Sequence, residues 1–377
     1  MSPVALPTLR CEVAFGTGAN PNAWTLDNTP FPVTLGPEFV DTYTNVSADV
    51  RAMKIYMGKS RELDQYQVGR TSVVLDNRAR DFDPLNLSGP YVSGGETQVK
   101  PGRRLRCFLT HPTTLVEYQM YQGVVRNWGL DYTGKFDAVS HAYASDAMTE
   151  LANTKVDLTT SAGASGTAMA EILAAAGIAN REVDAGNSTL QAMTFAADAL
   201  SAARVIEQSE QGTLYVEKDG TLTFLERHAL LNETRHNTSQ ATFGAGNLSI
   251  HEIEIGYESD IVKNKATVTR GGGAAQEFSD DESIAEYGEK AMTLTGMASA
   301  SDADALALAT YLVAKNAEPA VRVKSITIMP QFHADLMTQA LARRLLDRVT
   351  VQFAPFAPLV AYSKATLTDE AVEDPVN

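Results

Sequence analysis

Alternating carboxylates and guanidinium groups occupy residues 76–84, in the stretch LDNRARDFDP that ends an apolar run. Such side chains could coordinate a cation, contact phosphate or pair with another protein surface. A calcium loop beginning at Asp76 would need oxygen ligands at its third and fifth positions, glycine at the sixth and glutamate at the twelfth. These positions hold Arg78, Arg80, Asp81 and Leu87. The pattern therefore excludes a calcium loop, and we expect no metal site here.

The charges of this stretch also balance one another. Asp76, Asp81 and Asp83 offset the nearby arginines, so the segment offers little net attraction to a phosphate backbone. Guanidinium groups pair with carboxylates in a fixed bidentate geometry, which suits a joint between protein surfaces. A solvated turn that ends at Asp83 and Pro84 explains the same residues equally well. On the sequence alone, both interpretations stay open.

A second concentration of charge is the basic stretch KPGRRLR, residues 100–106. Because side chains alternate along a strand, only Arg104 and Arg106 would share a face. These residues could form a row of salt bridges with an acidic neighbouring subunit. They could equally mark a charged edge strand that discourages unwanted strand pairing.

No other combination of residues predicts a catalytic, cofactor or metal site. The six histidines are scattered, without an H-E-x-x-H motif. The stretch FGTGANPN has Pro21 where a dinucleotide loop has its third glycine, and GASG at 163–166 is not a nucleophile elbow. Asp280, Asp281 and Glu282 are consecutive acids on a polar connector, which is typical of a solvated face rather than a glycosidase pair. We therefore expect no enzymatic activity and no cofactor.

The overall charge restricts the function further. The 377 residues include 46 acidic and 31 basic side chains, which gives a formal net charge of −15. Binding to a phosphate backbone depends on clustered lysine and arginine, so this balance argues against a protein that grips nucleic acid. It fits a soluble enzyme, and it fits equally a conduit through which DNA slides without adhering.

Length and hydropathy predict a multidomain chain without a membrane span. A chain of 377 residues exceeds one usual hydrophobic core, so two to four domains are expected. No run approaches eighteen apolar residues, and the N-terminus lacks the pattern of a signal peptide. Cys11 and Cys107, the two cysteines, lie in strand-like runs and are expected to be buried free thiols.

The elements that must position these residues change in character along the chain. Residues 9–145 are short strands separated by turns rich in proline and glycine, which predicts an antiparallel barrel or sandwich. Helical periodicity then predicts a helix at 167–177, with Thr167 as its cap and Gly177 as its stop, and a second helix at 188–210. The dipeptide of Asp219 and Gly220 predicts a tight hairpin.

A second set of strands follows, in which Ile253, Ile255, Ala266 and Val268 are expected to face inward. A polar connector and one helix interrupt this set. That helix should begin at Ser301 with a capping box and stop before proline 319. The predicted layout is a β-domain at 1–148, an α+β module of two helices and a hairpin at 149–240, and a second β-domain at 241–377 with a helical insertion at about 278–318.

Taken in order, several short motifs resemble the opening domain of siphophage minor tail proteins from the tail-tip region. That family has a G-R-x-R-E-L-like turn, a strand ending in L-D-N-R, then F-x-P-x-N and a L/K-P-G-R motif. The corresponding residues are Gly58, Ser60, Arg61, Glu62 and Leu63; Leu75 to Arg78; Phe82, Pro84 and Asn86; and Lys100 to Arg103. Residues 212–228 and 283–296 also resemble later segments of such proteins, so the resemblance covers about 50–330.

The resemblance implies a baseplate hub or tail-associated protein. Its implied fold is mainly β with an α+β insertion, with two tube-like antiparallel β-barrel or sandwich domains. Three copies would form a pseudo-six-fold ring that continues and closes the tail tube of the virion, after assembly in the cytoplasm of the bacterial host. Implied neighbours are a distal tail protein or the tail tube above, other tail-tip or fibre proteins, and the tape measure protein. DNA would pass through without specific binding.

Within this picture the charged turns are interpreted as an assembly joint between copies. The residues assigned to the joint are Arg61, Glu62, Asp76, Arg78, Arg80, Asp81, Phe82, Asp83, Arg103 and Arg104. Two alternatives stay open: a distal tail protein that forms a hexameric ring, and a tail protein that binds or hydrolyses carbohydrate on the host surface. A ring of three copies would favour the hub and a ring of six the distal tail protein. Turnover of cell-wall polymer would support the second alternative.

Overall fold

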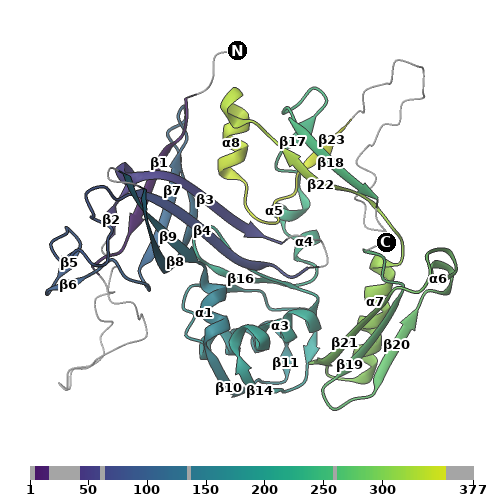
Figure 1. The fold of residues 1–377 in the computed structure, drawn as a ribbon. Helices are drawn as coiled ribbons and strands as arrows, with labels where there is room; N and C mark the ends of the chain where they lie inside the picture. Colours follow the sequence, from purple (N-terminus) through teal and green to yellow (C-terminus); the bar gives the residue numbers. More distant parts are fainter. Residues whose placement is uncertain (1–4, 17–42, 60–63, 134–136, 258–260, 354–377) are drawn as a thin grey trace.

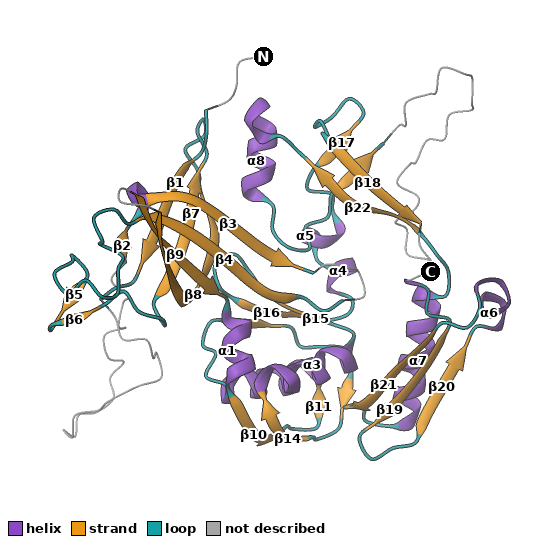
Figure 2. Cartoon of the chain, viewed as in Figure 1, coloured by secondary structure: helices purple, strands orange, loops and turns teal. Residues whose placement is uncertain are grey.

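The computed structural model describes residues 5–16, 43–59, 64–133, 137–257 and 261–353. Within them the chain forms a large N-terminal sheet, a compact module of helices and short strands, and a third region of small sheets with two longer helices (Figure 1). Figure 2 shows that strands dominate the N-terminal part, whereas helices gather in the module and the third region. The prediction of a mainly β chain with an α+β insertion is confirmed.

The N-terminal sheet has seven strands in the order β2-β1-β7-β8-β9-β4-β3, and every neighbouring pair is antiparallel. The end strands β2 and β3 do not pair with each other in the described residues, so the sheet is open rather than a closed barrel. Its strands are β1 (Thr8–Val13), β2 (Thr44–Asn45), β3 (Val50–Gly58), β4 (Gln67–Asp76), β7 (Arg104–Thr110), β8 (Glu117–Thr133) and β9 (Asp137–Ser145). A short helix η1 (Ser47–Asp49) precedes β3, and the loop after β4 carries the small hairpin of β5 (Val92–Ser93) and β6 (Glu96–Thr97).

One face of this sheet is a hydrophobic core, as the alternation of apolar residues predicts. Val73 and Leu75 of β4 are fully buried there together with Tyr121. Cys11 and Cys107 are register partners on β1 and β7, with their Sγ atoms 3.7 Å apart. Both are free and fully buried, which confirms the expectation for the two cysteines.

The α+β module follows the sheet without a linker. Helices α2 and α3 pack on each other, and Ile172, Leu173 and Ile206 lie in one buried cluster with the hairpin β15–β16. Gly220 adopts φ of 84° in that hairpin, so the predicted tight turn is confirmed. The elements are α1 (Ala147–Asn153), β10 (Lys155–Thr159), β11 (Gly163–Ala164), α2 (Ser165–Ala175), β12 (Arg181–Val183), β13 (Thr189–Leu190), β14 (Thr194–Asp198), α3 (Ala199–Glu210), β15 (Thr213–Val216), β16 (Leu222–Leu225), α4 (Ala229–Asn232) and α5 (Thr234–Asn237).

Two details of the predicted helices are wrong. The helix predicted at 188–210 begins only at Ala199, because β14 pairs with β10 and buries Phe195 in the module core. Asp198 caps the helix by accepting a hydrogen bond from the backbone N–H of Ser201 at 2.8 Å. The first helix begins at Ser165, so the predicted cap, Thr167, lies inside it. Its start is fixed by a tertiary contact, since the Ser165 hydroxyl donates to the buried carboxylate of Glu210 at 2.7 Å.

Asp146 joins the N-terminal sheet to this module. Its carboxylate is 3 % exposed and accepts hydrogen bonds from the backbone N–H of Gly69 on β4 and of Met148 at the start of α1. Burial raises the pKa of Asp146 to about 6. The folded protein therefore holds this proton at a pH where the unfolded chain has lost it, so stability should fall as the pH rises from about 4 to about 6.

We expect Asp146→Asn to remove this pH dependence, because an amide does not titrate. Between pH 4 and pH 7 the wild type should lose on the order of 2 kcal/mol of unfolding free energy relative to the variant. Urea denaturation at several pH values measures the difference. Parallel pH profiles for the two proteins would show that the carboxylate is ionised at the same pH in both the folded and the unfolded state.

The third region consists of small sheets rather than one large one in the described residues. Strand β19 lies between β20, which is antiparallel to it, and β21, which is parallel to it, and α7 packs on this sheet through Leu308 and Leu312. The elements are β17 (Thr242–Gly244), β18 (Glu252–Tyr257), β19 (Lys265–Arg270), β20 (Ala275–Ser279), α6 (Asp281–Tyr287), β21 (Ala291–Met297), α7 (Asp302–Asn316), β22 (Val321–Thr327), η3 (Pro330–Phe332), α8 (Ala334–Ala342) and β23 (Thr350–Gln352). Strands β18 and β22 form an antiparallel ribbon, and β17 pairs in parallel with β23.

Several predictions for this region are confirmed and others need revision. Ser301 caps α7 as predicted by accepting from the backbone N–H of Asp304 at 3.1 Å; the Asp304 carboxylate accepts from the Ser301 hydroxyl rather than from its backbone N–H, so the capping box is half formed. Ala266 and Val268 are buried as expected, whereas Ile253 and Ile255 are half-buried. The segment predicted as a helical insertion, about 278–318, also holds β21, and α8 was not predicted. The domain boundaries at 148 and 240 stay predictions.

Candidate functional site

The charged loop after β4, residues 76–86, is held by two ion-pair clamps within the chain. The first clamp closes on Asp76 at the end of β4. The Nε of Arg78 donates to this carboxylate at 2.9 Å, and Arg51 of β3 bridges Asp76 at 3.1 Å and Asp137 at 2.7 Å. Hydrogen bonds from Arg78 and attraction to Arg51 hold the pKa of Asp76 well below its usual range.

The second clamp closes on Asp83, whose side chain is buried. Arg80 donates to one of its oxygens at 2.7 and 2.9 Å, and the hydroxyl of Tyr132 donates to the same oxygen at 3.0 Å. The backbone N–H of Leu85 donates to the other oxygen at 2.8 Å. Burial acts to raise the pKa of Asp83, but these hydrogen bonds outweigh it and the pKa lies below its usual value.

Phe82 anchors the loop in the core of the N-terminal sheet. Its side chain is 1 % exposed and lies 5.3 Å from the ring of Tyr91 and 6.5 Å from that of Phe15, measured between ring centroids. The carbonyl of Phe82 accepts from Ser140 on β9, and its N–H donates to the side chain of Asn77. The side of the loop that faces the core is therefore fixed, while the charged side chains on its opposite side are open to solvent.

The clamps leave part of the predicted joint accessible. The side chains of Arg78 and Arg80 are 63 % and 55 % exposed, although each pairs with a carboxylate of its own loop. Arg80 also has a positive φ of 63°, so the backbone is tightly turned where its side chain projects. Asp81 is half-buried beside them. Guanidinium groups carry five donors, and a carboxylate that takes two of them leaves donors for a second surface.

The other predicted joint residues lie in different surroundings. Arg103 is 2 % exposed and donates to the carbonyl and side chain of Gln98, and burial lowers its pKa. Arg104 opens β7, which lies between β1 and β8, so a charged edge strand at this position is wrong. On the same strand Arg106 pairs with Glu12 of β1 at 2.6 Å, inside the chain rather than across subunits. Arg61 and Glu62 lie outside the described residues.

A second ionic cluster was not predicted, because its members are far apart in sequence. Glu217, at the end of β15, is 4 % exposed and pairs with Arg235 at 2.7 Å and Arg344 at 2.8 Å. Asp347 pairs with Arg235 at 2.8 Å, and the hydroxyl of Tyr215 donates to Glu217. The cluster fastens the segment after α8 to the module hairpin.

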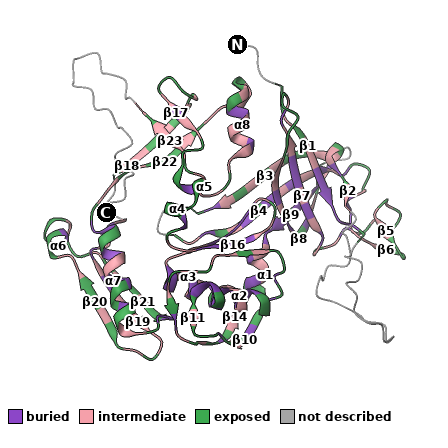
Figure 3. Ribbon diagram, turned by 180° about the vertical axis from the view of Figure 1, so that it is seen from behind, coloured by how far each residue is buried: buried purple, intermediate pink, exposed green. Residues whose placement is uncertain are grey.

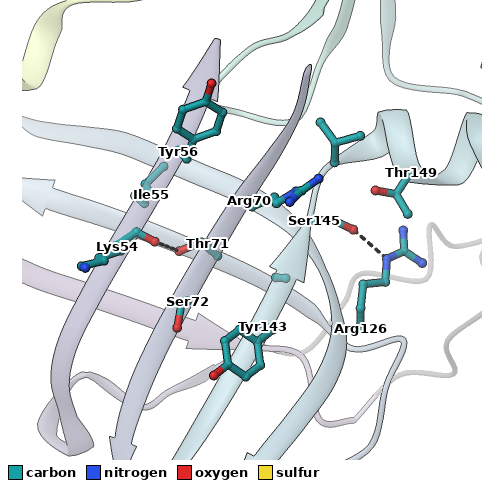
Figure 4. A pocket seen from close by; sticks show the side chains of 12 residues that line it. Lys54, Ile55, Tyr56, Arg70, Thr71, Ser72, Arg126, Tyr143, Ser145 and Thr149 are labelled. Atoms are coloured by element: carbon teal, nitrogen blue, oxygen red, sulfur yellow. Dashed lines mark hydrogen bonds between the residues drawn. The ribbon is translucent and has the colours of Figure 1, made fainter. Parts of the chain in front are cut away.

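A groove of about 700 Å³ lies on the outer face of the N-terminal sheet (Figure 4). Cross-strand register places Tyr56 beside Arg70 and Ser145, and Lys54 beside Ser72 and Tyr143. A bulge in β8 turns Arg126 toward the groove, where it donates to the hydroxyl of Ser145 at 2.8 Å. The groove thus combines aromatic rings with three basic side chains.

Neither a metal site nor a spanning helix is found in the described part of the chain. No group of three or more histidine, cysteine, aspartate or glutamate side chains is placed to hold a metal ion there. None of the helices described is both long and apolar enough to cross a membrane.

Comparison with known proteins gives matches in structure only. No family model and no curated protein sequence matches the chain. A tail protein from Neisseria meningitidis MC58 is similar with a TM-score of 0.46 and 12 % identity, over 81 % of this chain and 75 % of that one. The 43 kDa tail protein of prophage MuSo2 from Shewanella oneidensis has a TM-score of 0.46 and 11 % identity, over 77 % and 81 %. Prophage tail protein gp18 from Listeria monocytogenes EGD-e has a TM-score of 0.40 and 9 % identity, over 74 % and 76 %.

These three solved structures are tail proteins, two of them from prophages. These matches do not distinguish a tail-tip hub from other tail proteins, so the narrower expectation of a hub stays a prediction.

Proposed function

We propose that the chain is a structural protein of a phage tail tip, a baseplate hub whose copies form a ring around the tail axis. The observation that carries this proposal is the open N-terminal sheet. Its end strand β3 is nine residues long and has no partner on its outer side among the described residues. At the other end, among the described residues, β2 covers only the last two residues of β1. Exposed strand edges of this kind are ready to pair with another chain.

Two different free edges on one chain favour head-to-tail association, which closes into a ring when the rotation between copies fits. In the proposed ring the charged loop at 76–86 fixes the register between copies through Arg78 and Arg80. The formal charge of −15 suits a passage in which DNA moves without adhering. The chain would act by its shape and contacts, with no reaction of its own, between the tail tube or distal tail protein and the other tip proteins.

The mass of the assembled protein tests this proposal and its nearest alternative. We expect purified protein to form a species of about three times the chain mass of 40.6 kDa in analytical ultracentrifugation or mass photometry. Six copies would favour a distal tail protein instead. A chain that stays monomeric over the full accessible concentration range would contradict the ring.

The loop has its own test, because its arginines are exposed. Replacing Arg78 and Arg80 together by alanine should lower the unfolding midpoint only modestly. Both arginines are exposed, and the buried carboxylate of Asp83 keeps its hydrogen bonds from Tyr132 and Leu85 when Arg80 is removed. Ring formation should decrease at the same protein concentration. Arg348→Ala removes an exposed arginine elsewhere and serves as the control. Unchanged ring formation in the double variant would show that the loop is only a solvated turn.

A further inference from the structure

The groove on the outer face of the N-terminal sheet contains two basic side chains that pair with no acidic side chain of the described residues. Arg70 of β4 lies beside Tyr56, and Lys54 lies further along β3, opposite Ser72 (Figure 4); neither basic side chain forms an ion pair within the described residues. Arg126, by contrast, lies 3.7 Å from Glu150. Unpaired cations are unusual on a chain with 15 more acidic than basic side chains. The groove therefore fits an acidic surface better than a neutral one.

The aromatic rings of the groove support a protein occupant. Tyr56 and Tyr143 are 47 % and 43 % exposed. In the strand pairing Tyr56 lies opposite Arg70, and Tyr143 lies opposite Ser72. Tyrosine and arginine are enriched at protein–protein interfaces, where rings supply apolar contact and guanidinium groups supply directed hydrogen bonds. The groove also adjoins the free edge of β3, which the proposed ring uses.

Helix α6 is the complementary surface on the same chain. Its exposed side carries Asp281, Glu282 and Glu286, and none of the three is paired with a basic side chain in the described residues. Phe278, which is 37 % exposed, precedes the helix and adds an aromatic ring to this surface. Figure 3 shows that exposed residues prevail over β20 and α6.

The helix is also held rigidly, so its carboxylates keep a fixed arrangement. Ser283 on its inner side donates to the carbonyl of Ala317 at 2.5 Å and accepts from Asn264, and the side chain of Asn264 also donates to the carbonyl of Gly288 at 2.8 Å. Asp280 caps the helix through the N–H of Ser283. A preordered surface loses less conformational entropy on binding than a mobile one.

We propose that the groove of one copy receives helix α6 of the next copy in the ring. Asp281, Glu282 and Glu286 lie against Lys54 and Arg70, and Phe278 packs beside Tyr56 or Tyr143. The groove lies on the N-terminal sheet, whereas α6 lies in the third region at the opposite side of the molecule (Figure 1). Two distinct patches on one chain make a heterologous contact, which builds a ring by repetition. This inference rests on the proposed ring and specifies one of its contacts.

Cross-linking of two variants, each with one added exposed cysteine, tests the contact without altering its charges. Ser72→Cys places a thiol in the groove, and Ala285→Cys places one on the exposed side of α6. The native Cys11 and Cys107 are fully buried and should not react. We expect a short bismaleimide to produce a cross-linked pair of chains when the two variants are mixed. The yield should exceed by at least tenfold that of a control mixture with Ala196→Cys, an exposed alanine on β14.

Charge reversal provides the second arm of the experiment. Lys54→Glu with Arg70→Glu should reduce ring formation at least tenfold at a fixed concentration, and adding Glu282→Lys with Glu286→Lys should restore it. If wild-type rings form but the reversed variant assembles equally well and the cross-link does not exceed the control, the contact is wrong while the ring stands. If the wild type forms no ring, both the contact and the proposed function fail.

Discussion

Replacing Phe82 by alanine is expected to lower the free energy of unfolding by about 3–5 kcal/mol. The side chain is 1 % exposed and packs between aromatic rings of the N-terminal core, so its removal leaves a cavity that the clamped loop cannot fill. Chemical denaturation followed by tryptophan fluorescence measures the change, because Trp128 lies in the same buried cluster.

The matched control is Leu85→Ala, three residues further along the same loop. Leu85 is 80 % exposed, so its truncation should change stability by no more than about 0.5 kcal/mol. A loss of less than about 1 kcal/mol for Phe82→Ala would mean that the loop is not anchored by its aromatic residue, which contradicts the rigid joint.

Replacing Glu217 by alanine is expected to lower the free energy of unfolding by about 3 kcal/mol, because the change removes one of the two buried carboxylates that pair with Arg235 and leaves only Asp347. Glu217 is 4 % exposed and receives hydrogen bonds from Arg235, Arg344 and Tyr215. The segment after α8 should also become more accessible to proteolysis, since Arg344 would no longer hold it to the hairpin. Denaturation and limited proteolysis measure the two effects.

The control for this change is a carboxylate whose ion pair is exposed. Glu254 lies 3.8 Å from Lys324, with 63 % and 38 % of the two side chains exposed. Glu254→Ala should change the unfolding free energy by less than about 1 kcal/mol. Equal effects of the two substitutions would show that the buried cluster contributes no more than a surface pair.

Features set by neighbouring residues could be predicted from the sequence. The hairpin at Asp219 and Gly220 depends on a turn that tolerates positive φ, and the start of α7 depends on the capping box of Ser301 and Asp304. In each case the physical cause lies within a few residues of the element.

Features decided by distant residues could not be predicted in the same way. Residues 188–198 have apolar side chains at helical spacing, yet pairing of β14 with β10 makes their last part a strand. The cluster around Glu217 joins residues about 130 positions apart, which no spacing rule can connect. Helix α8 had a usable signal that was missed, in the spacing of Leu336, Met337 and Leu341.

The same distinction applies to the candidate site. The residue types at 76–84 indicated paired guanidinium and carboxylate groups, and the structure pairs Asp76 with Arg78 and Asp83 with Arg80. The sequence could not show that Phe82 holds this loop in the core, or that the groove of Lys54 and Arg70 lies on one face, because both depend on strand register. The role of the loop between copies stays a proposal.

A density map of particles that contain this chain tests the central claim most directly. The account predicts a closed ring of copies on the tail axis, in which the edge of β3 and the loop at 76–86 lie at the contact between neighbouring copies. A map that places the chain away from the axis, or as a single copy with both edges of its N-terminal sheet in solvent, would contradict it.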